Sequence, residues 1–256
     1  MKKTVFIACA ALFSASLIAA QSADEIVDAS RNRIKADTTS IRARLLIAAK
    51  DGSTTERLVD EYSKDYPSGD KAIIVFQSPA SVKGTRFLTV EKEGPDDRWI
   101  FLPALGKVRR VSASEGSSSF VGTDFSYDDM AAMTRSVSDD AHRILREEKA
   151  EGKDCWVIES APKDASYQYA RMLQWIEKDT KLIRKIEGYD KKGNLAKVLE
   201  VLKTEVVQGR LTAMSTRMTT VADKTSTTIN MEIVKYDEKI PDAVFTTEYL
   251  STGRVK

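Results

Sequence analysis

The chain has 256 residues, of which 40 are basic, 38 are acidic and 42% are hydrophobic. Lys2 and Lys3 belong to an N-terminal segment that we expect to be removed, which leaves 38 basic residues against 38 acidic ones. This balance argues against a nucleic-acid-binding protein, which usually carries a clear basic excess. The remaining length is sufficient to build a sizeable hydrophobic core.

Residues 1–20 have the pattern of a cleavable signal peptide. Two lysines precede an apolar run from Val5 to Ile18, and Ala19-Ala20 then lead into a polar stretch. The run is shorter than the roughly 20 apolar residues that span a bilayer. We therefore predict export, cleavage between residues 20 and 22, and one domain over residues 21–256, with an uncleaved N-terminal anchor as the alternative. Cys9 would leave with this segment, so Cys155 would have no partner for an internal disulfide.

The next elements are a helix and a long series of strands. Ser22 and Glu25 form a capping-box pattern, which predicts a helix with a narrow apolar stripe that lies on other structure. From residue 40 the apolar residues recur with a period of two, and short turns such as Asp51-Gly52 and Gln208-Gly209 favour an antiparallel meander. The predicted strands cover residues 41–49, 55–64, 72–77, 85–91, 98–102, 154–160, 167–177, 182–189, 195–204, 211–221 and 227–236.

Several strands are apolar on both faces, most clearly residues 167–177. This pattern favours a sheet that is curved around a core or cavity and partly covered by helices. A second capping-box pattern from Ser126 to Asp129 predicts one such helix, continuing through Met133. The serine-rich residues 112–119 predict a mobile loop that does not pack. The charge-rich residues 134–149 are compatible with an edge strand, a helix or a linker.

The sequence offers no recognisable catalytic, metal or cofactor site. His142 is the one histidine of the mature chain and is predicted to be a solvated surface residue, since an imidazole metal site needs further ligands. Cys155 lies in a predicted strand, which favours a packing role. Ser68 and Lys71 match a serine–lysine motif but occupy a turn before a strand. Asp124, Asp128 and Asp129 lack the spacing of a calcium loop, and helix capping accounts for two of them.

Two apolar and aromatic segments remain, residues 97–110 (DRWIFLPALGKVRR) and 118–129 (SSFVGTDFSYDD). Together with Gly84–Leu88 and Ile240–Phe245, they resemble the outer-membrane lipoprotein-sorting protein family, the LolA-like periplasmic carriers, in a branch of uncharacterised members. The resemblance covers most of the mature chain.

This resemblance implies a mainly β fold, a curved antiparallel half-barrel of about eleven strands with a few helices covering an apolar cavity. It also implies a periplasmic carrier without catalysis or cofactor, which holds acyl chains of lipids or lipoproteins in transit between the inner and outer membranes. The residues implied to line the cavity or its lid are Trp99, Phe101, Leu102, Phe120, Phe125, Met130 and Met133. Arg109 and Arg110 would contact lipid phosphate or a partner, or else form ion pairs with the acids near residues 124–129.

The resemblance further implies a monomer that exchanges its cargo with an inner-membrane transporter of the RND or ABC type and an outer-membrane acceptor. Two other functions stay open at this point. The first is a sensor or adaptor of the same fold that regulates a membrane partner, and the second is a secreted hydrolase with dispersed carboxylates.

Overall fold

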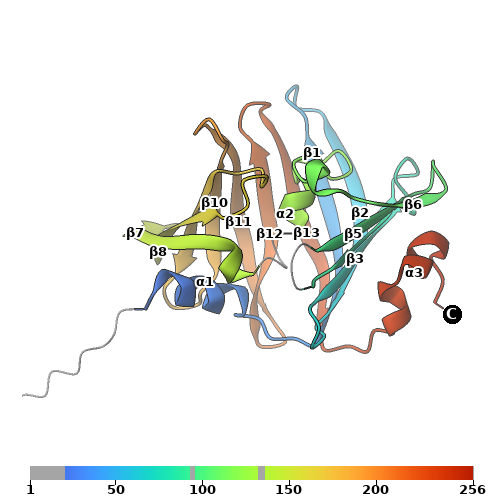
Figure 1. The fold of residues 1–256 in the computed structure, drawn as a ribbon, viewed down its shortest axis with the longest axis horizontal. Coiled ribbons are helices and arrows are strands. Elements are labelled where there is room, and N and C mark those ends of the chain that lie inside the picture. The colour runs from blue at the N-terminus through green and yellow to red at the C-terminus, as the bar shows by residue number, and fades with distance from the viewer. Residues whose placement is uncertain (1–20, 93–95, 132–135, 256) are drawn as a thin grey trace, which may run out of the picture.

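A computed structural model describes residues 21–92, 96–131 and 136–255 of the chain (Figure 1). Its helices are α1 (Ala23–Arg31), α2 (Tyr127–Ala131) and α3 (Thr247–Thr252), with short 3₁₀ turns η1 (Ala113–Glu115), η2 (Val137–Asp139) and η3 (Asp242–Phe245). Its strands are β1 (Thr38–Ala48), β2 (Thr54–Lys64), β3 (Lys71–Ser78), β4 (Arg86–Val90), β5 (Asp97–Leu102), β6 (Lys107–Arg110), β7 (Asp140–Ala150), β8 (Lys153–Pro162), β9 (Arg171–Glu177), β10 (Ile183–Tyr189), β11 (Leu195–Val207), β12 (Arg210–Thr220) and β13 (Thr225–Tyr236).

All these strands belong to one antiparallel sheet, in the order β6-β5-β4-β3-β2-β1-β13-β12-β11-β10-β9-β8-β7. Two meanders, β1–β6 and β7–β13, therefore run outward from a central pair in which β1 lies beside β13. Their register places Ala43 opposite Met231 and Leu45 opposite Ile229. The free edges of the sheet, β6 and β7, are consecutive in the chain, so the segment between them must pass from one edge of the sheet to the other.

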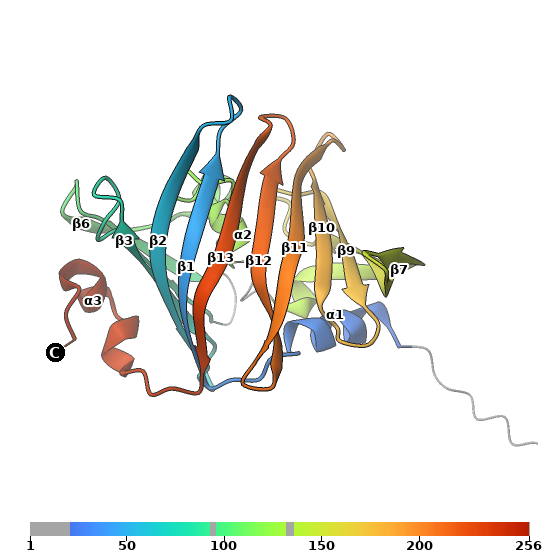
Figure 2. The ribbon, with the colours of Figure 1, turned by 180° about the vertical axis from the view of Figure 1, so that it is seen from behind.

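The sheet is curved but not closed, and that connecting segment crosses its concave face. Figure 1 views the molecule from the concave side, with α1 and α2 in front of the sheet, and Figure 2 shows the convex side with both helices behind it. The fold class predicted from the sequence is confirmed. Thirteen strands replace the eleven that were expected. Apolar alternation does not mark β6, and it leaves residues 134–149, which hold most of β7, open between an edge strand, a helix and a linker.

The reasons for these two omissions are visible in the strands themselves. β6 has only four residues, of which three are basic or exposed, so it offers no period of two. β7 is an edge strand whose charged side chains are largely exposed, as is common for edges that must not pair with another molecule. The predicted strand at residues 167–177 also begins later, at Arg171, because the preceding residues form a loop.

The convex face carries a second apolar cluster beneath the C-terminal segment. The outward-facing residues Ile73, Val75 and Leu88 of β3 and β4 are covered by Val244, Phe245 and other residues of η3 and α3. Arg86 fixes the end of this segment, donating a hydrogen bond from Nη1 to the Leu250 carbonyl at 2.7 Å. The C-terminal segment thus covers the strands near one edge from outside (Figure 2).

The predicted first helix is confirmed, including its capping box. The Ser22 hydroxyl accepts from the Glu25 amide at 3.2 Å, and the Glu25 carboxylate accepts from the Ser22 amide at 2.8 Å. The apolar stripe of α1 buries Ile26 and Val27 against Ile158 and Ile176 of the sheet. The helix therefore lies on the concave face near the β7 edge.

The serine-rich residues 112–119 are held by backbone hydrogen bonds, although most of them are exposed. The Gly116 carbonyl accepts from the Asp128 amide at 2.9 Å, and the Ser118 carbonyl accepts from the Tyr127 amide at 3.2 Å. A Cβ atom on Gly116 would lie 2.3 Å from the Asp128 carboxylate, so only glycine permits this approach. Backbone hydrogen bonds to α2 thus supply the packing that the small polar side chains do not.

Candidate functional site: the concave face of the sheet

The concave face is filled on one side by an aromatic cluster. Phe120 and Tyr127, from the segment that crosses the sheet, pack against Phe76 of β3 and Phe87 of β4. The ring centroids of Phe87 and Phe120 lie 5.1 Å apart, and those of Phe120 and Tyr127 lie 5.6 Å apart in an edge-to-face arrangement. Burial of Tyr127 raises the pKa of its phenol. The crossing segment is thus held to the β2–β5 half of the sheet by apolar contact.

A buried aspartate holds the same segment to the centre of the sheet. The Asp124 carboxylate accepts hydrogen bonds from the hydroxyls of Thr220 and Thr227, each at 2.7 Å, and from that of Thr225. Its amide donates to the Thr227 hydroxyl at 2.9 Å. These threonines belong to β12 and β13, so Asp124 is a polar anchor between the crossing segment and this hairpin.

Helix α2 is anchored on both sides by its two acidic residues. Asp128 forms an ion pair with Arg98 of β5, with 3.0 Å between Nη1 and Oδ1. Asp129 accepts from Lys197 Nζ of β11 at 2.7 Å and from the Tyr169 hydroxyl at 2.8 Å. It also accepts from the Ser126 amide at 2.8 Å, which confirms the predicted second capping box. Helix α2 therefore bridges the two halves of the curved sheet.

Several apolar side chains of the concave face beside this segment are partly exposed. Ile41 of β1, Leu199 of β11 and Ile229 of β13 pack against the inner cluster but stay partly exposed. Met130 of α2 does the same. The partly open concave surface is therefore apolar over the central strands.

One carboxylate interrupts this apolar surface. Successive cross-strand pairs place Glu61 of β2 in a row with apolar side chains, which share its face because directly opposed residues project to the same side of a sheet. The row runs Ile100, Phe87, Ile74, Glu61, Ile41, Val234. Burial raises the pKa of the Glu61 carboxyl from its ordinary value of 4.5 to about 7. The sequence contains one signal for this position, since Val59, two residues earlier, belongs to the core face.

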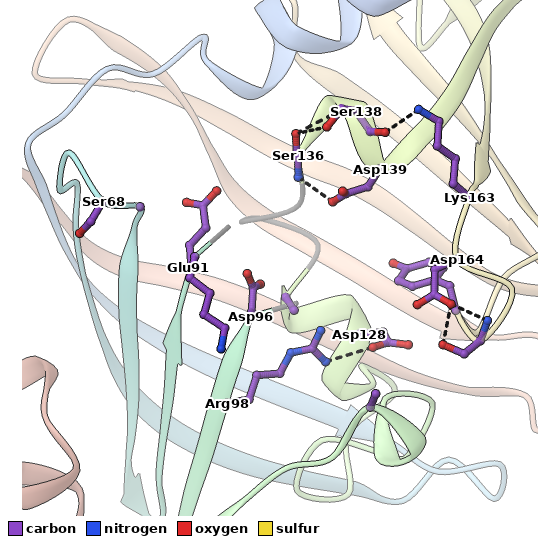
Figure 3. Close-up of a pocket in the computed structure, with 16 residues that line it drawn as sticks. Ser68, Glu91, Asp96, Arg98, Asp128, Ser136, Ser138, Asp139, Lys163 and Asp164 are labelled. Atoms are coloured by element: carbon purple, nitrogen blue, oxygen red, sulfur yellow. Dashed lines mark hydrogen bonds and ion pairs between the residues drawn. The ribbon is translucent and has the colours of Figure 1, made fainter. Parts of the chain in front are cut away.

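A pocket of about 840 Å³, lined mainly by charged and hydroxyl-bearing residues, lies between the two ends of the curved sheet (Figure 3). One wall comes from the loops flanking β3 and β4 and from β5, and the other from η2 and the loop between β8 and β9. Its labelled residues are Ser68, Glu91, Asp96, Arg98, Asp128, Ser136, Ser138, Asp139, Lys163 and Asp164. Lys163 donates from Nζ to the Ser138 carbonyl at 2.7 Å, and Ser166 donates to Asp164 at 2.7 Å. Charged and hydroxyl-bearing residues thus gather at the opening of the half-barrel, whereas the partly exposed side chains over the central strands are apolar.

Several comparisons place this chain among known proteins. A family model that carries the description "Uncharacterized protein" matches residues 68–252 of this chain. A DUF1329 family protein from Desulfovibrio piger is 30% identical, with a TM-score of 0.85, and the match covers 89% of this chain and 97% of that one. The chain belongs to the DUF1329 family. No curated protein matches it.

The same comparisons confirm the resemblance to outer-membrane lipoprotein-sorting proteins. A domain from Vibrio parahaemolyticus assigned to outer membrane lipoprotein sorting is 27% identical with a TM-score of 0.84, covering 90% of this chain and 98% of that one. A LolA superfamily protein from Nitrosomonas europaea shares the fold, at 22% identity and a TM-score of 0.72, with 90% and 100% of the two chains covered. In the described part of this DUF1329 chain, no helix has the length and hydropathy to cross a membrane.

The structure divides the predicted cavity residues between two faces. Leu102, Phe120, Phe125 and Met130 belong to the concave cluster. Trp99 and Phe101 project to the convex face, where they pack against the cluster beneath the C-terminal segment. Alternation along β5 is the reason, since Ile100 and Leu102 face inward and the residues between them face outward. Met133 lies outside the described residues.

The two candidate arginines do not pair with the acids near residues 124–129. Arg109 pairs with Glu115 at 2.7 Å, and Arg110 pairs with Asp97 across the β5–β6 hairpin. Both arginine side chains are exposed, at 41% and 62%. Arg98, which the sequence analysis had not singled out, is instead the partner of Asp128. Contact of Arg109 and Arg110 with lipid or a partner stays a prediction.

His142 is not the solvated surface residue that was predicted. Its Nε2 lies 3.1 Å from the Val137 carbonyl, and its Nδ1 lies 2.7 Å from the Ser160 hydroxyl, which accepts from Gln174 at 2.7 Å. With Nε2 donating to the carbonyl, Nδ1 accepts from Ser160. Because Ser160 is fully buried, this chain of hydrogen bonds holds strands together and offers no accessible nucleophile.

The three aspartates considered for a cation site point to different partners. Asp124 faces threonines, Asp128 faces Arg98 and Asp129 faces Lys197. Among the residues that the structure describes, no group of three or more histidine, cysteine or acidic side chains is arranged to hold a metal ion. Cys155 is buried, and burial raises the pKa of its thiol.

Proposed function

We propose that this DUF1329 protein is a periplasmic carrier that binds an acyl chain of a lipid or lipoprotein against the concave face of its sheet. The observation that carries the proposal is the partly exposed apolar surface at Ile41, Leu199 and Ile229, which lies inside an unclosed curved sheet. The likeness to an outer membrane lipoprotein-sorting protein domain, at 27% identity, supports the proposal. The signal-peptide pattern of residues 1–20 supplies the route out of the cytoplasm.

The energetics favour a binding protein in this role. Burial of one methylene contributes about 0.8 kcal/mol, so a chain of about 15 methylenes gains roughly 12 kcal/mol when it leaves water. Such a chain does not cross an aqueous compartment unaided. A sheet that stays open at one side gives the chain a way in and out, and the pocket at the opening offers charged and hydroxyl side chains to the protein part of an acylated cargo.

The experiment is a binding and transfer assay with a matched pair of variants on β13. Ile229 faces the concave side opposite Leu45, whereas Ile233 faces the convex side opposite Arg42 and is 46% exposed. We expect Ile229→Ser to weaken the binding of a fluorescent acyl lipid about tenfold, since it removes apolar contact worth about 1.5 kcal/mol. Ile233→Ser should leave binding unchanged.

Cargo and transfer are measured in parallel. Native mass spectrometry of protein isolated from its own compartment should reveal bound lipid or acylated protein, and the purified protein should move labelled lipid between vesicles. Protein that is empty, binds no acyl lipid and transfers none would overturn the carrier function. Equal losses in Ile229→Ser and Ile233→Ser would instead show that binding does not use the concave face.

A further inference from the structure

Glu61 lies between apolar side chains in its row across the sheet, and Ser63 follows it on the same face of β2. Its cross-strand neighbours on the concave face are Ile41 and Ile74, and Val59 precedes it on the same face of β2. Across residues 21–92, 96–131 and 136–255, no side chain forms a hydrogen bond or ion pair with its carboxylate. Burial alone raises its pKa, without any contribution from a neighbouring charge. The side chain is nevertheless partly exposed, so a ligand on the concave face can reach it.

The nearest charged groups are directed elsewhere. On the concave faces of β1, β2 and β3 the one other charged side chain is Arg57, four residues from Glu61 and therefore roughly 13 Å along the strand. Arg57 donates to the Val121 carbonyl of the crossing segment. On α2, which packs over this face, Asp128 pairs with Arg98, and Asp129 accepts from Lys197 and Tyr169.

A carboxylate without a partner on an apolar surface is unfavourable for the free protein. A bound cation would remove that penalty by supplying the missing charge, and a charge-assisted hydrogen bond is stronger than a neutral one. An anionic head group would be repelled at the same position. The unpaired Glu61 carboxylate on an apolar surface therefore favours a ligand that has a cationic head group as well as an apolar chain.

We propose that Glu61 is the polar recognition group of the acyl-binding face, and that the preferred ligand is an amphiphile carrying an amine. The ammonium group pairs with the Glu61 carboxylate while the chain lies along the partly exposed apolar residues beside it, beginning with Ile41. This inference rests on the proposed carrier function and specifies the head group that the carrier prefers. Because the free carboxyl has a pKa of about 7, the preference for an amine weakens as the pH falls below that value.

Titration calorimetry with three amphiphiles that share one chain length tests this preference. The probes are dodecylammonium, dodecyl maltoside and dodecanoate, each below its micelle concentration, against wild-type protein and the isosteric variant Glu61→Gln. Glu56→Gln is the matched control, since Glu56 lies on the same strand, faces the other side and is exposed. The titrations are run at pH 8 and pH 5.5.

At pH 8 we expect Glu61→Gln to bind dodecylammonium about tenfold more weakly than the wild type and dodecyl maltoside equally well. At pH 5.5 the difference between the two proteins should shrink, and Glu56→Gln should match the wild type throughout. If dodecyl maltoside binds but the wild type shows no preference for dodecylammonium, or prefers dodecanoate, the role of Glu61 is overturned and the carrier function stands. If none of the probes binds the wild type, both are overturned. Circular dichroism of each variant confirms that it is folded.

Discussion

Two adjacent acids on β2 show how strongly the face of a strand determines the chemistry of a side chain. Asp60 projects to the convex side, where it accepts hydrogen bonds from Arg42 at 2.7 Å and Gln77 at 2.8 Å. Glu61 projects to the concave side among apolar residues and has no such partners in the described chain. A carboxylate thus stabilises the sheet at one position and is free for recognition at the next.

The isolation of Glu61 predicts a pH-dependent stability. The folded state keeps this proton up to about pH 7, whereas the unfolded chain loses it near 4.5. The contribution of Glu61 to the free energy of unfolding therefore falls as the pH rises between these values and is level above them. We expect Glu61→Gln to be more stable than the wild type by about 1–2 kcal/mol at pH 8, with the difference vanishing toward pH 4.5. Urea unfolding at both pH values measures this.

The control for that experiment is again Glu56→Gln, which should not be more stable than the wild type, because Glu56 is exposed and forms an ion pair with Arg44. An equal effect of both variants would assign the change to net charge. If Glu61→Gln were instead less stable than the wild type at pH 8, Glu61 would be ionised more readily in the folded protein than in the unfolded chain.

Asp124 is the residue on which the position of the crossing segment most depends. Its removal leaves the hydroxyls of Thr220 and Thr227 without their buried acceptor, a loss that costs more than an exposed hydrogen bond. We expect Asp124→Ala to lower the free energy of unfolding by about 3 kcal/mol. Asp223→Ala, at an exposed turn residue of the same hairpin, should change it by less than about 0.5 kcal/mol. A small effect of Asp124→Ala would mean that aromatic packing alone holds the segment.

Among the elements, the segment between β6 and β7 and the C-terminal segment cover opposite faces of the same strands. Residues 111–131 bury the inward side chains of β3, β4 and β5, and η3 with α3 buries the outward ones. Strands near the β6 edge are therefore apolar on both faces for two independent reasons. Each covering element can be perturbed separately, because the side chains beneath it alternate along the strand.

Trp99→Ala tests this separation. Trp99 packs on the convex face beneath the C-terminal segment, so its truncation should lower the free energy of unfolding by about 2 kcal/mol, less than for a fully buried tryptophan. Acyl-lipid binding should be unchanged, since the concave face is untouched. Leu105→Ala, in an exposed turn where Leu105 is 62% accessible, is the control for a general loss of apolar surface. If Trp99→Ala abolished binding in a folded protein, the ligand site would extend to the convex face, as the sequence had implied.

How far the sequence predicts such elements depends on how local their signals are. Both capping boxes and the alternation of β1, β2 and β13 involve residues within a few positions of each other, and the structure confirms them. The pairing of β1 with β13 joins residues almost two hundred positions apart and has no local signal. For that reason the sequence did not show that residues 111–131 must cross the concave face.

The same limit applies to the faces on which the candidate site residues lie. The run Trp99–Leu102 is apolar at every position, so its alternation does not reveal which residues face the ligand. Two covering segments that are distant in sequence decide that question. Glu61 was not predicted, and His142 was predicted wrongly, for a similar reason. The surroundings of Glu61 come from β1 and β3, and those of His142 come from β8.

At the scale of the whole molecule, the open curvature of the sheet follows from the two meanders and their single connection. The connection bridges the two halves of the sheet across the concave face, through Arg98 of β5 on one side and Lys197 of β11 on the other. A bound acyl chain would add contacts between the same halves, so ligand binding should stabilise the entire fold.

This coupling predicts that removal of cargo lowers thermal stability. A ligand that binds only the folded state contributes about 2.7 kcal/mol at a concentration of 100 times its Kd. For a chain of this size that corresponds to a rise in Tm of about 5–10 °C. Calorimetry should be run on the protein isolated with its cargo, on the delipidated protein, and on the delipidated protein with added dodecyl maltoside. The Tm should fall on delipidation and rise again when dodecyl maltoside is added.

Ile233→Ser should recover its Tm as the wild type does, whereas Ile229→Ser should recover less at the same concentration. Identical recovery by both variants would place the stabilising ligand away from the concave face, since only Ile229 lies there.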